Sequence, residues 1–144
     1  MKTILLLPFG FLFLFSGKSK LYTENEHIKV KMEYSEKVSS AQKGELSFLL
    51  SPNAGIHVNT EPLFEILLDK DSHFTVNEEP VFSKNKEGYL AVTKPVLFTF
   101  SPKKGTAPGK YSLKGTLRYF FCSDAEGWCN RFSQPIDVTI EIGR

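Results

Sequence analysis

The feature that most constrains the fold is an alternation of apolar and polar residues with a period of two. It is clearest in segment 136–142, where isoleucine or valine alternates with an acidic residue or threonine. Such a period places all the apolar side chains on one face of a β-strand. The same alternation occurs in three further segments, 27–34, 45–51 and 111–121. No segment shows a helical period over a useful length, so the sequence predicts an all-β protein.

Turn-forming residues separate these segments from shorter apolar runs. We expect further short strands at residues 55–60, 64–68, 73–76, 89–92 and 96–100. Segment 35–44 is predicted to be a turn, and segment 77–88 an irregular, charged loop. Eight or nine short strands separated by turns are typical of an immunoglobulin-like β-sandwich. The chain has 144 residues without an internal repeat or linker, so we expect a single domain.

The first 19 residues have the layout of a secretory signal peptide. Lys2 precedes an apolar run at residues 4–15, and small residues follow at positions 16, 17 and 19. The apolar run is short for a membrane span. We therefore predict a signal peptide at 1–19 and a mature domain at 20–144 that is periplasmic or secreted, with an uncleaved anchor as the alternative. Export would place the cysteines where disulfides form and persist.

Charge and motif content argue against several classes of function. The formal net charge of +2 provides no basic field for nucleic acid. The three histidines are scattered and none lies near a cysteine in the sequence, so no zinc or copper site is expected. Neither a Gly-x-Ser-x-Gly nucleophile motif nor a phosphate-binding glycine loop occurs. We expect no cofactor, no metal and no nucleic-acid partner.

The only two cysteines, Cys122 and Cys129, lie at the tip of a predicted β-hairpin with six residues between them. Paired strand ends bring Cα atoms within disulfide range. Such a bond can be a structural staple worth roughly 2–3 kcal/mol, or it can exchange with other thiols. The small, polar loop 123–127 predicts sulfurs near solvent, where disulfides are exchangeable. Aromatic residues around the pair, Trp128 among them, offer a docking surface.

The segment Tyr-Phe-Phe-Cys-Ser-Asp-Ala-Glu-Gly-Trp-Cys at 119–129, followed by the strand at 136–142, carries a resemblance to a known family. It resembles the end of the N-terminal periplasmic domain of DsbD thiol:disulfide interchange proteins, a disulfide bond corrector-like domain. Segment 53–59 is similar to an early Gly-aromatic-His-Ile-Asn strand of that family. Loop 79–88 falls where the family carries a cap loop. The resemblance implies an immunoglobulin-like fold.

The same resemblance implies that Cys122 and Cys129 are the exchanging pair, with Cys129 bonding the partner. It assigns Phe82 to the cap over the disulfide and places His57 and Asn59 beside the active site. The implied partners are thioredoxin-like periplasmic proteins and a membrane electron transporter on a separate chain. The expected function is that of a periplasmic thiol:disulfide oxidoreductase or electron-relay domain. The alternative is a non-catalytic β-sandwich that binds an envelope protein and has a structural disulfide.

Overall fold

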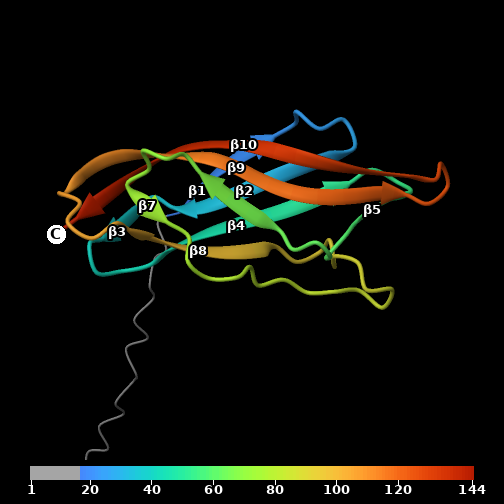
Figure 1. Ribbon diagram of the computed structural model, residues 1–144, viewed down its shortest axis with the longest axis horizontal. Coiled ribbons are helices and arrows are strands. Elements are labelled where there is room, and N and C mark those ends of the chain that lie inside the picture. The colour runs from blue at the N-terminus through green and yellow to red at the C-terminus, as the bar shows by residue number, and fades with distance from the viewer. Residues whose placement is uncertain (1–16) are drawn as a thin grey trace, which may run out of the picture.

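Two β-sheets pack face to face in the computed structural model, which describes residues 17–144 (Figure 1). The strands are β1 (Gly17–Tyr22), β2 (Ile28–Ser35), β3 (Lys37–Ser39), β4 (Gly44–Pro52), β5 (Ile56–Val58), β6 (Glu65–Leu68), β7 (Phe74–Thr75), β8 (Val96–Pro102), β9 (Gly109–Ser123) and β10 (Trp128–Gly143). One sheet has the order β1-β2-β4-β8-β7, and the other has the order β3-β10-β9-β5 with β6 also pairing with β9. The described residues contain no helix, so the all-β prediction is confirmed.

The core lies between the two sheets and is built from the predicted apolar faces. The first sheet contributes the alternating residues Ile28, Val30, Met32, Leu46, Phe48, Leu50, Val96, Phe98 and Phe100, all buried. The second sheet contributes Leu113, Leu117, Tyr119, Phe121, Ile136, Val138, Ile140 and Ile142. The phenol of Tyr119 accepts a hydrogen bond from Asn25 Nδ2 at 3.1 Å. Burial raises the pKa of Tyr119 to about 12, so this phenol stays neutral inside the core.

The longest elements, β9 and β10, form an antiparallel hairpin that spans the molecule. Every residue from Gly109 to Ser123 has a partner on β10. The tip of this hairpin projects at the end of the sandwich opposite the C-terminus (Figure 1). The hairpin was predicted, but β10 is longer than expected because the alternation is interrupted by Gln134 and Pro135. Gln134 is fully buried at an inward position where the pattern expects an apolar residue, so the sequence did not indicate that the strand continues there.

Glycine at position 115 allows β6 to lie against β9. Gly115 pairs with Leu68, and a Cβ atom at this position would lie 2.3 Å from the backbone oxygen of Leu67 and 2.9 Å from the Cα atom of Leu68. The backbone of β6 therefore occupies the space that a side chain would need. This contact accounts for the one missing apolar residue in the alternation of segment 111–121.

Two short strands were missed by the sequence pattern. Strand β1 pairs with β2, and the domain boundary predicted at residue 20 falls inside it. Residues 1–16 of the predicted signal peptide lie outside the described part of the chain. Strand β3 lies within the segment predicted as a turn and pairs in parallel with Glu141–Gly143. Three residues are too few to show a period of two.

The strand predicted at residues 89–92 is wrong. Only Leu90 makes an isolated bridge there, with Lys84. The Asn85 side chain explains the difference, because its Oδ1 atom accepts hydrogen bonds from the backbone N–H groups of Glu87 and Tyr89 at 3.1 and 2.9 Å. An asparagine that bonds the local backbone in this way favours a turn over a strand.

We predict that Gly115→Ala lowers the free energy of unfolding by about 2–3 kcal/mol, because the β6 backbone must move. Denaturant unfolding of the purified protein measures this. Gly143→Ala is the matched control, since the nearest atom to its added Cβ lies 3.9 Å away. The control should change stability by less than about 1 kcal/mol. Equal effects of the two substitutions would contradict the proposed packing of β6.

Candidate functional site

The two cysteines form a disulfide across the β9–β10 hairpin, one pair before its loop. Cys122 and Cys129 are directly opposite each other in the register, with Cα atoms 4.0 Å apart. The loop is closed by a hydrogen bond of 2.9 Å from the Gly127 N–H group to the Ser123 carbonyl. Gly127 has a φ of +71°, a conformation that glycine adopts without a steric cost. The hairpin therefore holds the two sulfurs together at one end of the sandwich.

The two cysteines differ sharply in exposure. Cys122 is only 5% exposed, whereas Cys129 is exposed. The sequence prediction that both sulfurs lie near solvent is therefore wrong for Cys122. The difference follows from strand order, because β9 is flanked by β10 on one side and by β5 on the other. At Cys129 the outer edge of β10 is not covered by β3, which pairs only with residues 141–143.

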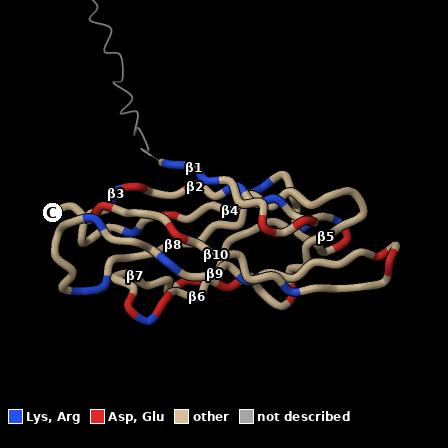
Figure 2. Tube along the Cα trace, turned by 90° about the horizontal axis from the view of Figure 1, so that it is seen from above, with Lys and Arg blue, Asp and Glu red and all other residues tan. Residues whose placement is uncertain are grey.

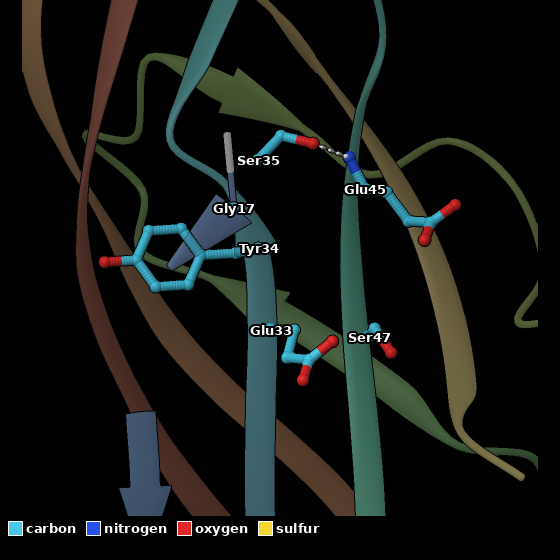
Figure 3. A pocket seen from close by; sticks show the side chains of 6 residues that line it. All are labelled: Gly17, Glu33, Tyr34, Ser35, Glu45 and Ser47. Atoms are coloured by element: carbon cyan, nitrogen blue, oxygen red, sulfur yellow. Dashed lines mark hydrogen bonds between the residues drawn. The ribbon is translucent and has the colours of Figure 1, made fainter. Parts of the chain in front are cut away.

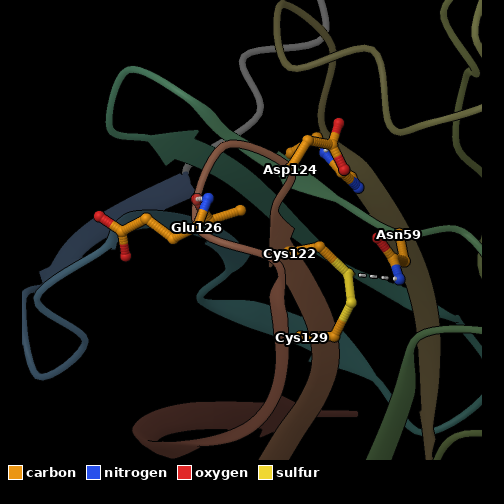
Figure 4. Close-up of a disulfide and its surroundings, with 7 residues drawn as sticks. Asn59, Cys122, Asp124, Glu126 and Cys129 are labelled. Carbon is orange, nitrogen blue, oxygen red and sulfur yellow. Dashed lines mark hydrogen bonds and ion pairs between the residues drawn. A yellow bond between two sulfur atoms is a disulfide. The ribbon is translucent and has the colours of Figure 1, made fainter.

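Strand β5 brings two predicted site residues against Cys122. His57 pairs with Cys122 across β5 and β9, so the two side chains project from the same face of the sheet. The His57 Nδ1 atom lies 3.3 Å from Asp124 Oδ2. Just beyond β5, the Asn59 Nδ2 atom donates a hydrogen bond to the Cys122 sulfur at 3.3 Å (Figure 4). Both cysteines, His57 and Asn59 therefore form one cluster.

Trp128 lies on the other face of the hairpin. It pairs with Ser123, and its ring packs against Phe121 with centroids 5.8 Å apart and against His27 at 4.9 Å. Its indole N–H group donates to Glu126 Oε2 at 2.6 Å. Because neighbouring strand residues point to opposite faces, Trp128 closes the end of the core and does not share the face of the sulfurs. The same alternation places Phe121 in the core.

The loop predicted to cap the disulfide, 79–88, carries Phe82, and Tyr89 follows it directly. Phe82 is partly buried and packs edge-on against Phe64, with centroids 5.2 Å apart. Directly after this loop, Tyr89 stacks on the His57 ring with centroids 3.7 Å apart. Sequence reasoning missed Tyr89 because it assigned this residue to a strand. The available signal was the Asn-x-x-Gly-Tyr order at 85–89, in which Asn85 and Gly88 mark a turn.

The pockets elsewhere on the surface are lined mainly by strand side chains. Figure 3 shows one of them, lined by Gly17, Glu33, Tyr34, Ser35, Glu45 and Ser47. It lies at the Ser35 end of β2. The other end of β2 follows His27, which contacts Trp128, so strand length separates this pocket from the hairpin tip by about 25 Å. The pocket is therefore a separate feature from the cysteine cluster.

Acidic and basic residues are mixed along the whole length of the molecule (Figure 2). Acidic residues occur at the hairpin tip, where the loop carries Asp124 and Glu126. Within residues 17–144, no group of three or more histidine, cysteine or acidic side chains is placed to hold a metal ion. In the same part of the chain, no helix has the length and apolar character that a membrane span requires.

Comparison with known proteins supports the fold. No family model and no curated protein matches the chain. Among solved structures, the chain is similar to the GAE domain of yeast GGA1, with 12% sequence identity and a TM-score of 0.50. The match covers 84% of this chain and 98% of the GAE chain. At this identity the likeness shows the fold alone, which is an immunoglobulin-like β-sandwich, as predicted.

We predict that, after reduction, a small alkylating reagent modifies Cys129 at least about tenfold faster than Cys122, because thiol reactivity depends on access. Mass spectrometry of peptides from a time course measures both rates in the same sample. Denaturing the protein should make the two rates similar, which serves as the control. Equal rates in the folded protein would contradict the difference in exposure described above.

Proposed function

We propose that this protein is a thiol:disulfide exchange module that relays electrons through the Cys122–Cys129 pair. The observation that carries the proposal is the asymmetry of the disulfide. Cys129 is an exposed residue at the sheet edge, whereas Cys122 is buried and a polar side chain contacts its sulfur. Exchange requires one sulfur that an incoming thiolate can reach and a second that can leave and later return. The cluster provides both.

The hairpin does not depend on the disulfide for its strand pairing. Residues of β9 from Gly109 onward are paired with β10 up to the loop, so the bond joins strands that a continuous ladder already aligns. In the chain-entropy model, a loop this short contributes only about 2–3 kcal/mol when it is closed. A chain of 144 residues can bury a sufficient core without disulfides. These points favour exchange over a purely structural role.

The exposed position of Cys129 makes it the attacked sulfur. A partner thiolate bonds to Cys129 Sγ while the Cys122–Cys129 bond breaks. The electron pair of the broken bond remains on Cys122 Sγ, which becomes a thiolate. A second thiolate of the partner then attacks the partner's own bonded sulfur and releases Cys129. The partner leaves as a disulfide, and the two protons that its thiols gave up balance those taken up by the cysteine pair. The reverse sequence passes the two electrons to the next protein.

The exchange reaction needs no cofactor, because the sulfurs carry the electrons. The resemblance to DsbD-type domains supports thioredoxin-like partners and a membrane electron transporter on another chain. It also supports a periplasmic location, reached by means of the signal peptide proposed at residues 1–19. In this proposal His57 and Asn59, which lie beside Cys122 on the β5 side, form the side of the site away from the partner.

A capture assay tests the proposal. Variants of this protein are mixed with a thioredoxin that retains only its exposed cysteine, and that cysteine is first activated as a mixed disulfide with thionitrobenzoate. Cys122→Ala leaves Cys129 as the only thiol. This variant should form a stable protein–protein disulfide, with release of coloured thionitrobenzoate. Cys129→Ala, the matched variant, should react at least about tenfold more slowly because its thiol is buried.

The double variant Cys122→Ala/Cys129→Ala gives the background rate. If Cys122→Ala captures thioredoxin no faster than this background, the proposed function is wrong. If Cys129→Ala captures it as fast as Cys122→Ala does, the assignment of the attacked sulfur is wrong. Circular dichroism of each variant establishes that the sandwich remains folded.

A further inference from the structure

Asn59 is fixed in position beside the buried sulfur of Cys122. Its backbone N–H group donates to the Phe120 carbonyl at 2.8 Å, which extends the β5–β9 pairing by one residue. The following residue, Thr60, is buried, and its hydroxyl donates to the Gly88 carbonyl at 2.9 Å. These two hydrogen bonds fix the backbone at residues 59 and 60, from which the Asn59 side chain reaches the sulfur. The contact in Figure 4 is a consequence of the sheet register.

Only one of the two polar atoms of the Asn59 amide has a hydrogen-bond partner among the described residues. A disulfide sulfur carries no hydrogen, so it can only accept, and Nδ2 donates to Cys122 Sγ at 3.3 Å. The Oδ1 atom is buried and has no hydrogen-bond partner among the described residues. Leaving such an acceptor unpaired in a protein interior costs on the order of the desolvation of one polar group, and native structures rarely accept it without a reason.

Reduction of the disulfide changes the hydrogen bonds that the Cys122 sulfur can make. A Cys122 thiol has an S–H group that can donate to an acceptor, and a thiolate accepts hydrogen bonds strongly. The Asn59 amide presents a donor for the thiolate and an acceptor for the thiol in the same side chain. The Asn59 Oδ1 atom, which has no partner within residues 17–144 in the oxidised state, is thus the acceptor that the S–H group of reduced Cys122 needs.

We propose that Asn59 is a catalytic residue of the exchange site that stabilises Cys122 as the leaving and returning sulfur. When the Cys122–Cys129 bond breaks, the electron pair stays on Cys122 Sγ and the Asn59 Nδ2–H group donates to the thiolate. When the thiolate takes up a proton, the S–H group donates to Asn59 Oδ1. The Asn59 amide beside Cys122 therefore favours the reduced form of this sulfur. The inference rests on the proposed exchange function and assigns a role within it.

Other charged and titratable groups also surround Cys122. His57 faces it from β5, and Asp124 lies beside His57 on the hairpin loop. Tyr89 stacks on the His57 ring. Arg131 lies on β10, two residues beyond Cys129 and thus on the same face of the sheet. These groups act on the sulfur in every variant used below, and Asn59→Leu, which adds no charge, isolates the amide.

The test is a pH titration of the Cys122 thiolate in a Cys129→Ala background, followed by ultraviolet absorbance and corrected with the double cysteine-to-alanine variant. Asn59→Asp keeps an acceptor but removes the donor and adds a negative charge. It should reduce the thiolate fraction at neutral pH by about tenfold or more, since a hydrogen bond to a charged group is worth at least one pH unit of titration. Asn59→Leu removes both groups and should give a smaller reduction.

Asn130→Asp is the matched control. It makes the same chemical change at an exposed position next to residue 129, on the opposite face of the sheet. The control should change the thiolate fraction by less than about twofold, because the new charge is screened by solvent. In the protein with both cysteines, Asn59→Asp should slow reduction by a thiol roughly three- to tenfold, since a poorer leaving thiolate departs more slowly.

An Asn59→Leu titration that matches the one with Asn59 in place, or an Asn59→Asp titration that matches the Asn130→Asp titration, would overturn the role of Asn59. That result would leave the capture of thioredoxin by Cys129 unaffected, so the proposed function would stand. Failure of the capture assay with a normal Asn59 would instead overturn the proposed function. The titration and the capture assay thus separate the two claims.

Discussion

The arrangement of the site depends on the pairing of β9 between β10 and β5. This register places Cys129, Cys122 and His57 side by side across three strands. It also decides which sulfur is buried, because β9 is an interior strand and the hairpin end of β10 is an edge. A slip of one residue in either pairing would turn the side chains to opposite faces and separate the cluster. The strand register thus controls the chemistry available at the hairpin tip.

Much of the fold could be predicted from the sequence, because the core strands follow a strict period of two. The inward positions of β4 and the C-terminal half of β10 are buried as predicted. Elements without that signal were missed or misplaced: β1, the three-residue β3, and segment 89–92, where the Asn85 side chain imposes a turn. Short strands depend on tertiary pairing more than on local pattern, so sequence alone could not locate them.

The site was only partly predictable for a similar reason. The spacing of Cys122 and Cys129 in a hairpin indicated the disulfide. The burial of one sulfur, however, depends on β5, which comes from a distant part of the chain. The contact of Asn59 with Cys122 and the stacking of Tyr89 on His57 likewise join segments far apart in sequence. No local pattern reports which side chains such a pairing brings together.

An immunoglobulin-like sandwich does not by itself specify an activity, so the proposed exchange function depends on the cysteine pair. The most direct test is the redox equilibrium of Cys122–Cys129 in a series of glutathione buffers, read by thiol alkylation. We predict a midpoint potential clearly above about −300 mV, because structural disulfides typically lie below that value and exchanging ones above it. A midpoint below that value, with the disulfide resistant to glutathione, would contradict the relay and identify the bond as a staple.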